Sequence, residues 1–176
     1  VTGSELVGLI PLDALLEAGR YYLKKQGKTT GVPESELIHV AVLSLGLSDL
    51  YPFENDKKII EYQFAGKDIL TGMTIKDFLN LLSTDAPAPG GGSVAALCGA
   101  LSGALCSMVA ALTHGKKDYE SQTTEMEEIG IKSQKLTSLF AADVDRDTEA
   151  FNKVMQAMRL PKKTDEEKLY RSKQIE

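Results

Sequence analysis

Histidines and cysteines are scarce in this sequence, and basic residues are fewer than acidic ones. Its 176 residues contain 20 Lys and Arg against 25 Asp and Glu, which gives a formal net charge of −5. This acidic balance argues against a nucleic-acid binder, because affinity for phosphates requires clustered Lys and Arg. Two cysteines and two histidines do not suffice for a four-ligand zinc site of the usual spacing, so no metal site is predicted. The remaining composition, 43% hydrophobic and 26% charged, is that of a globular chain of one domain or two small pieces.

Two further features are missing at the ends of the chain. It begins Val1-Thr2-Gly3, with no initiator Met and no basic-then-apolar signal peptide. It ends at Glu176, inside a stretch that is typical of a charged helix. We therefore expect the 176 residues to be a segment of a longer gene product.

The hydrophobic pattern predicts a mostly α-helical chain whose first part has α/β or α+β character. Short strands are expected at residues 4–10 and 58–64, and turn residues mark a boundary at 65–72. Thr164 and Glu167 form a capping box before the last expected helix. Helical spacing and end signals predict helices at residues 12–26, 33–45, 74–82, 93–113, 123–158 and from 165 onward.

Residues 86–113 contain no charged side chain, so a membrane-spanning helix has to be weighed. The run is rich in small residues, large apolar residues are few, and the chain offers no second span. We therefore favour a central helix buried on all sides, with a ridge of small residues along which another backbone can approach closely. That ridge consists of Ala95, Gly99, Gly103, Ser107 and Ala111. Cys98 and Cys106, about 12 Å apart along such a helix, are too distant for a disulfide and are expected to be buried thiols in a reducing compartment.

A glycine-rich loop precedes this helix. Gly90, Gly91 and Gly92 free the backbone for positive φ and for close approach of a ligand, and Ser93 suits the N-cap position. The unpaired N–H groups of a helix N-terminus can hold a carboxylate or the polar edge of a ring. The alternative is a tight entry loop with no ligand. No Lys is present for a phosphate-binding P-loop, and no strand is expected before the glycines, as a dinucleotide fingerprint requires.

One acidic residue lies on the apolar face of the expected long helix. At about 100° per residue, Asp147 shares its stripe with Asp143 and with apolar residues, whereas Asp145 and Glu149 point away and are expected to be solvated or paired. Desolvation, with a second carboxylate one turn away, should raise the pKa of Asp147 and let it take and return a proton. The alternative is an Asp paired with a cation or a backbone N–H. The apolar members of the stripe are Leu136, Phe140, Phe151, Val154 and Met158.

A basic corner follows this helix at residues 159–163, which include Lys162. Such a corner either attracts an anionic substrate or is simply solvated. His39 and His114 are isolated in the sequence, and neither is assigned a role.

Several segments together resemble the formiminotetrahydrofolate cyclodeaminase/cyclohydrolase family. They are residues 88–96 (APGGGSVAA), 145–151 (DRDTEAF), 159–162 (RLPK) and 166–168 (EEK). Residues 3–12 (GSELVGLIPL) resemble the end of the formiminotransferase C-terminal subdomain. In this order they resemble the bifunctional formimidoyltransferase-cyclodeaminases of histidine breakdown. The resemblance implies the end of a transferase subdomain at 1–63, a linker at 64–72, and the N-terminal part of an all-α cyclodeaminase domain at 73–176.

The resemblance also implies an activity. The parent enzyme would transfer a formimino group from N-formimino-L-glutamate to tetrahydrofolate, then close N10 onto that group and expel ammonia to give 5,10-methenyltetrahydrofolate. It implies polyglutamylated folate as co-substrate, no metal, a cytoplasmic location, and a dimer within a larger ring-shaped oligomer.

In this resemblance the catalytic acidic residue of the cyclodeaminase falls on Asp147. Gly90, Gly91, Gly92, Ser93, Asp143 and Lys162 are then candidates for holding folate. The catalytic His of the transferase has no counterpart here, and the cyclodeaminase helices expected after Glu176 are absent, so the segment alone is expected to be inactive. Two alternatives remain: a methenyltetrahydrofolate cyclohydrolase, against which the transferase-like residues 1–63 argue, and a non-catalytic helical assembly module.

Overall fold

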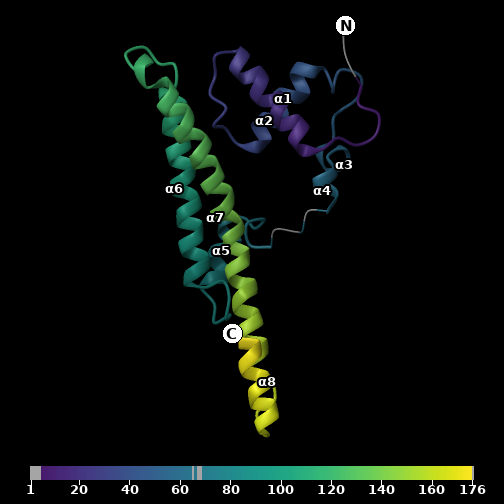
Figure 1. The fold of residues 1–176 in the computed structure, drawn as a ribbon, viewed down its shortest axis with the longest axis vertical. Helices are drawn as coiled ribbons and strands as arrows, with labels where there is room; N and C mark the ends of the chain where they lie inside the picture. The colour runs from purple at the N-terminus through teal and green to yellow at the C-terminus, as the bar shows by residue number, and fades with distance from the viewer. Residues whose placement is uncertain (1–4, 65, 67–68, 176) are drawn as a thin grey trace. The chain divides into compact units, whose positions relative to one another are not determined.

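The computed structural model describes residues 5–64, 66 and 69–175, and their regular structure is helical (Figure 1). This confirms the mostly α fold. In chain order the helices are α1 (Leu12–Lys25), α2 (Glu34–Leu45), α3 (Asn55–Lys58), α4 (Ile60–Phe64), α5 (Ile75–Leu82), α6 (Gly91–Thr113), the short 3-10 helix η1 (Glu120–Gln122), α7 (Thr123–Met158) and α8 (Asp165–Ile175).

The two predicted strands do not form among the described residues. Within residues 5–64, 66 and 69–175, extended pairing is limited to one parallel bridge between Ile10 and Ile59. In it, Ile10 N donates to Lys58 O at 2.9 Å and Ile60 N donates to Ile10 O at 3.0 Å. The prediction was wrong because α3 and α4 flank Ile59 closely, and because Pro11, which has no N–H to donate, leads directly into α1. Residue 4 of the first predicted strand lies outside the described residues.

The chain forms two compact units. Unit 1 consists of Val1–Gly66 with Ser102–Thr137, and unit 2 of Lys67–Leu101 with Ser138–Glu176. Each unit therefore combines two separate stretches of sequence, and α6 and α7 contribute residues to both units.

The core of unit 1 lies between α1 and α2. Leu15, Ile38 and Ile59 are buried completely or almost so, and burying such a side chain contributes about 1.5–3 kcal/mol. The two helices approach closely because α1 carries Gly19, where a Cβ would overlap the carbonyl oxygen of Leu37. The predicted spans of both helices are confirmed to within two residues, and α2 ends at Gly46, whose φ of 67° suits glycine.

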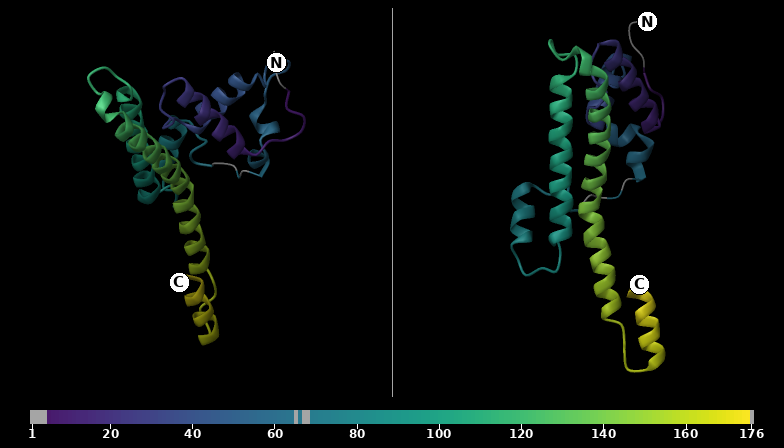
Figure 2. Two further views of the ribbon diagram at one scale, coloured as in Figure 1. Left: turned by 45° about the horizontal axis from the view of Figure 1, so that its top comes forward. Right: turned by 60° about the vertical axis from the view of Figure 1, so that its left-hand side comes forward.

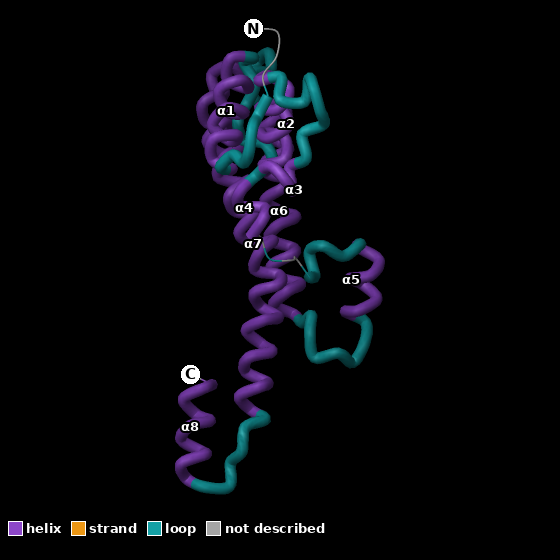
Figure 3. The backbone as a smooth tube through the Cα atoms, turned by 90° about the vertical axis from the view of Figure 1, so that its right-hand side faces the viewer, coloured by secondary structure: helices purple, strands orange, loops and turns teal. Residues whose placement is uncertain are grey.

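In unit 2, α5 packs on residues of α6 and α7 through a core that includes Leu70, Phe78 and Val144. Figures 2 and 3 show α5 alongside the N-terminal part of α6, and α8 folded back beside the end of α7. The predicted capping box of α8 is confirmed: Glu167 N donates to Thr164 Oγ1 at 3.2 Å, and Thr164 N donates to Glu167 Oε2 at 3.1 Å.

The prediction that α6 is buried on all sides was wrong. The middle of its ridge of small residues does meet α7, since a Cβ at Gly99 would lie 3.0 Å from the ring of Phe140 and one at Gly103 would lie 2.6 Å from Thr137 Oγ1. The two ends of the ridge, Ala95 and Ala111, are exposed. The opposite face is exposed, with Leu101 at 58% and Leu112 at 68%. In the described part of the chain, α6 alone is long and apolar enough to cross a membrane, and 17% of its apolar window is buried.

The prediction that the two cysteines of α6 are buried was also wrong. Cys98 and Cys106 are exposed and form no disulfide. The physical reason is that the helix uses its smallest residues, not its larger ones, for contact with α7.

Candidate functional site

The glycine-rich loop and the first turn of α6 form one side of the site. The helix starts at Gly91, because Val94 N already donates to Gly90 O at 3.1 Å in the helical pattern. Ser93 is therefore inside the first turn and is not the predicted N-cap. Gly90, Gly91 and Gly92 do not have positive φ, so that part of the predicted reason for these glycines was wrong.

What Gly92 provides is space for Asp147. A Cβ at Gly92 would overlap the carboxylate of Asp147, so only glycine lets this carboxylate lie against the helix. Ser93 Oγ donates to Asp147 Oδ2 at 3.1 Å and lies 3.1 Å from Thr148 Oγ1. Two features singled out independently in the sequence, the glycine loop and Asp147, are thus in direct contact within unit 2.

The carboxylate of Asp147 lies against the first turn of α6. The first turn of α6 contains no acidic residue, and the N-terminus of a helix carries a partial positive charge. Asp147 is half-buried, and Ser93, its hydrogen-bond donor, is completely buried. A carboxylate held in this way at the edge of a helix N-terminus can accept a proton from a bound molecule and return it.

Asp143 lies one turn before Asp147, as the spacing predicts, but it has a partner of its own. Its Oδ1 forms an ion pair with Nη1 of Arg146 on the same helix. The carboxylate of Asp143 therefore lies next to a positive charge, three residues along the helix.

Lys162 does not lie near Asp147 in the folded chain. It lies exposed in the loop between α7 and α8, and α7 continues from Asp147 to Met158, roughly 16 Å at about 1.5 Å per residue. Figure 3 shows this loop at the C-terminal end of α7, beyond the start of α6.

Asp145 has a structural role in unit 2. It accepts hydrogen bonds from Leu70 N at 2.8 Å, and from Thr71 N and Thr71 Oγ1 at 3.4 Å and 3.2 Å. This confirms the prediction that Asp145 is solvated or paired. It fixes the segment that leads into α5.

Beside that segment is an apolar pocket of about 320 Å³. Its walls come from α5, α6 and α7, and include Phe78 and Val94 together with Val144. Val94 and Val144 are close in sequence to Ser93 and Asp147, so the pocket borders the same two turns of α6 and α7. In the described part of the chain, no group of three or more His, Cys, Asp or Glu side chains is placed to hold a metal ion.

Comparison with known protein families gives two matches along this chain. The model described as "Formiminotransferase-cyclodeaminase" matches residues 74–176, and the one described as "Formiminotransferase domain" matches residues 1–65. The chain belongs to the formiminotransferase-cyclodeaminase family. The contact between Gly92 and Asp147 lies wholly within the first of these matches.

Curated members of this family match over nearly the whole chain. The formimidoyltransferase-cyclodeaminase of Mus musculus is 38% identical over 175 residues, which are 96% of this chain and 31% of the mouse protein. That of Dictyostelium discoideum is 37% identical over 167 residues. The methenyltetrahydrofolate cyclohydrolase of Methylorubrum extorquens is 45% identical over 103 residues, 58% of this chain and 50% of that protein. The chain thus spans 31% of the length of the bifunctional relatives.

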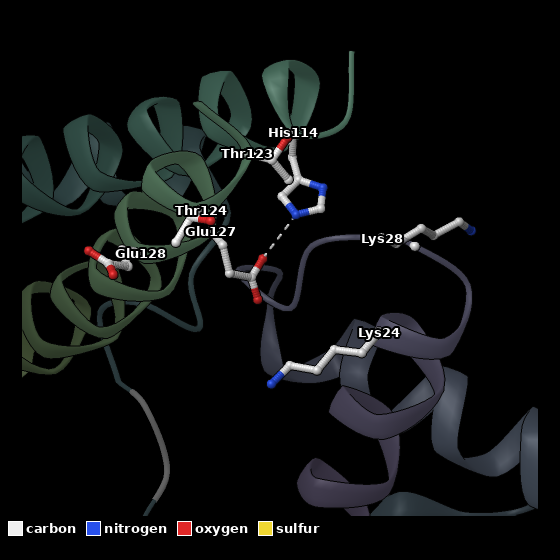
Figure 4. Close-up of a pocket in the computed structure, with 8 residues that line it drawn as sticks. Lys24, Lys28, His114, Thr123, Thr124, Glu127 and Glu128 are labelled. Carbon is white, nitrogen blue, oxygen red and sulfur yellow. Dashed lines mark ion pairs between the residues drawn. The ribbon is translucent and has the colours of Figure 1, made fainter. Parts of the chain in front are cut away.

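A second group of polar residues, which the sequence did not reveal, lies in unit 1 of this family member. Glu127 Oε2 lies 3.6 Å from His114 Nε2 on the wall of a pocket of about 510 Å³ (Figure 4). Lys24 and Lys28 line the same pocket from the transferase-matched part of the chain. In sequence, Glu127 is one acid among several at the start of a long helix, where acids are ordinarily solvated, and no motif marks it.

The hydrogen bonds of Glu127 determine its protonation. Burial acts to raise the pKa of its carboxyl group, but hydrogen bonds from Thr29 and Thr30, together with the nearby His114, outweigh burial and lower the pKa from its ordinary value. Glu127 is therefore ionised at neutral pH, and its contacts are those of a carboxylate.

Proposed function

We propose that this chain is part of a bifunctional folate enzyme of histidine breakdown. The enzyme transfers a formimino group from N-formimino-L-glutamate to tetrahydrofolate and then converts 5-formimidoyltetrahydrofolate to 5,10-methenyltetrahydrofolate and ammonia. The observation that carries the proposal is the succession of a formiminotransferase match and a cyclodeaminase match in one chain. The names of the relatives that match both parts support it.

In this proposal Asp147 carries protons during ring closure. N10 of the folate attacks the carbon of the protonated formimino group, and a new C–N bond forms. The carboxylate of Asp147 takes the proton that N10 loses, and the carboxyl group gives a proton to the amine, so that the old C–N bond breaks and ammonia leaves. The half-buried position of Asp147 against Gly92 and Ser93 supports this role.

The folate itself is proposed to bind at the first turn of α6. Gly90 and Gly91 have open space where a side chain would be, so a planar ring can approach the backbone there, beside Asp147. Asp143 and Lys162 are proposed as further contacts. Lys162, exposed at the end of α7, suits a carboxylate of a polyglutamate tail better than the reacting ring.

The domain organisation and assembly are also proposals. The transferase part is placed at residues 1–63, the linker at 64–72 and the cyclodeaminase part at 73–176, in a cytoplasmic enzyme that forms dimers within a larger ring. The exposed leucines of α6 support self-association, because a monomer rarely leaves such a face uncovered.

The test is a single substitution in the full-length enzyme. Asp147→Asn keeps the size of the side chain but removes its ability to take and return a proton, so formation of the methenyl chromophore from 5-formimidoyltetrahydrofolate should fall by about 100-fold or more. Glu149→Gln, an exposed position on the same helix, should leave the rate unchanged. Ring closure by Asp147→Asn at the wild-type rate would refute the assignment.

One alternative has an observation in its favour. The cyclohydrolase of Methylorubrum extorquens is 45% identical over 103 residues, 58% of this chain. A cyclohydrolase would act on the methenyl compound with water and would release no ammonia. Measuring ammonia release from 5-formimidoyltetrahydrofolate separates the two reactions.

A further inference from the structure

The loop between α1 and α2 is fixed to the α6–α7 hairpin, although the two come from different family matches. The loop, residues 29–31, belongs to the transferase match, and the hairpin belongs to the cyclodeaminase match. Unit 1 contains both, since it joins Val1–Gly66 to Ser102–Thr137. The compact unit therefore does not follow the family boundary.

The first layer of this contact is a carboxylate held by two threonines. Thr29 Oγ1 donates to Glu127 Oε2 and Thr30 Oγ1 donates to Glu127 Oε1, each at 2.5 Å. Thr30 N also donates to both carboxylate oxygens, at 3.1 Å. Both threonines are buried, and hydrogen bonds to an ionised group are the strong ones.

The second layer is a contact of two backbones. A Cβ at Gly31 would lie 2.6 Å from the Cα of Gly130 on α7, and a Cβ at Gly130 would lie 3.3 Å from the Cα of Gly31. No side chain fits between the loop and the helix at this point.

The third layer satisfies the carbonyl group of the loop. Ser107 Oγ on α6 donates to Gly31 O at 3.0 Å and accepts a hydrogen bond from Gln134 Nε2 on α7 at 2.6 Å. Ser107 and Gly31 are both buried. Both helices of the hairpin therefore contact Gly31.

We propose that these contacts form a permanent joint, the Glu127 joint, which holds the transferase part on the cyclodeaminase part without help from the peptide connection between them. The partner of the α6–α7 hairpin is thus a segment of the same chain. The hairpin contacts the hydroxyl groups of Thr29 and Thr30 and the backbone of Gly31, which has no side chain. The proposal goes beyond the proposed activity and rests only on the family assignment and the contacts of unit 1.

The experiment cuts the connection and asks whether the parts separate. A recognition site for a sequence-specific protease is inserted after Gly66, which is exposed, in the 176-residue chain. After cleavage, the two fragments should co-elute in gel filtration at micromolar concentration and separate only in denaturant. Fragments that separate in buffer, each with a helical circular-dichroism spectrum, would overturn the proposal.

Single substitutions test whether the Glu127 joint is responsible for the association of the two fragments. Glu127→Ala should weaken the association of the fragments by about tenfold or more, because it removes every charge-assisted hydrogen bond of the first layer. Glu128→Ala, its exposed neighbour on the same helix, should leave the association unchanged. Equal affinity of the Glu127→Ala and wild-type fragments would exclude Glu127 as the centre of the joint.

A second variant distinguishes loss of the contact from misfolding of the hairpin. Gly31→Ala changes only the loop and places a Cβ against the backbone of Gly130, so it should separate the fragments while the hairpin fragment keeps its helicity. Gly66→Ala, where an added Cβ meets nothing within 4 Å, is the matched control. The experiment measures association of the fragments and not turnover. A negative result for the Glu127 joint therefore leaves the proposed activity untouched, and a negative result for the activity leaves the proposed joint untouched.

Discussion

Ser93 Oγ on the first turn of α6 donates a hydrogen bond of 3.1 Å to Asp147 Oδ2 in the middle of α7. The Ser93 side chain is completely buried, whereas Asp147 is half-buried. One hydrogen bond therefore connects the start of α6 to the carboxylate for which catalysis is proposed.

Replacing Ser93 by Ala should slow ring closure and lower stability together. The free energy of unfolding should fall by about 1 kcal/mol, the usual contribution of such a hydrogen bond. Asp147 would lose its positioning donor, and kcat of the full-length enzyme should fall while KM for the folate changes less. Thr148→Val removes the other partner of Ser93 but keeps the bond to Asp147, and should affect kcat much less. Equal losses of kcat in the two variants would contradict the positioning role of Ser93.

Gly92 and Gly91 offer a matched pair on adjacent positions. An Ala at position 92 must displace the carboxylate of Asp147, whereas an Ala at position 91 meets nothing within 4 Å. We expect Gly92→Ala to reduce ring closure by at least about tenfold (roughly 1.4 kcal/mol of the activation barrier), whereas Gly91→Ala, which adds a methyl group only to the proposed folate site, should change KM for the folate more than kcat. Gly91→Ala should be neutral or more stable by up to about 1 kcal/mol, the gain in helix propensity. Steady-state kinetics and thermal unfolding would check both, and an active Gly92→Ala enzyme would contradict the observed packing.

Asp145 should matter for stability and not for chemistry. Asp145→Ala leaves Leu70 N and Thr71 without their acceptor, so the free energy of unfolding should drop by about 1–3 kcal/mol. Glu149→Ala, exposed on the same helix, should stay within about 0.5 kcal/mol of wild type. Urea titration of both variants makes the comparison, and a loss for Glu149→Ala as large as that for Asp145→Ala would refute it.

Tyr62 should make unit 1 sensitive to alkali. Burial, and next the hydrogen bond that its hydroxyl donates to Glu34, raise the pKa of Tyr62 from 10.0 to about 12. Because the pKa of Tyr62 is higher in the folded state than in the unfolded state, the protonated hydroxyl group contributes its full stabilisation below pH 10.0. This contribution is lost as the pH rises from 10.0 to about 12, where the unfolded state loses its proton first. Denaturant unfolding between pH 9 and pH 12 should therefore show a steeper decline for wild type than for Tyr62→Phe. Parallel declines would contradict the assignment.

The sequence predicts the helices well because their signals are local. The spacing of apolar residues and the ends marked by Pro33, Gly46 and Thr164 lie within a few residues of the elements that they define. The strands were predicted wrongly because residues 58–64 satisfy a local pattern that α3 and α4 override. The ridge of small residues marks the face of α6 that meets α7. The exposure of the opposite face was not predicted, because that face is apolar and carries no charged residue to indicate contact with solvent.

The candidate site was partly predictable because some of its signals are also local in the sequence. Helical spacing separates Asp147 from Asp145 and Glu149 without any tertiary information. The contact of Asp147 with Gly92 joins positions far apart in the sequence, and therefore appears only in the folded chain. Glu127 could not be predicted, since its partners Thr29 and Thr30 are farther still along the chain and nothing near Glu127 indicates them.

The discontinuous make-up of unit 1 has a consequence for synthesis of the protein. Its first stretch ends at Gly66, but the residues that complete it extend to Thr137. A ribosome that adds about 5–20 residues per second needs roughly 4–14 s for the intervening stretch. During this interval the loop at 29–31 has emerged without the helices that will bury it. The α1–α2 core can form at once, whereas the fit of the loop onto α6 and α7 must wait, so this surface is the part of the nascent chain that is exposed longest before its partner exists.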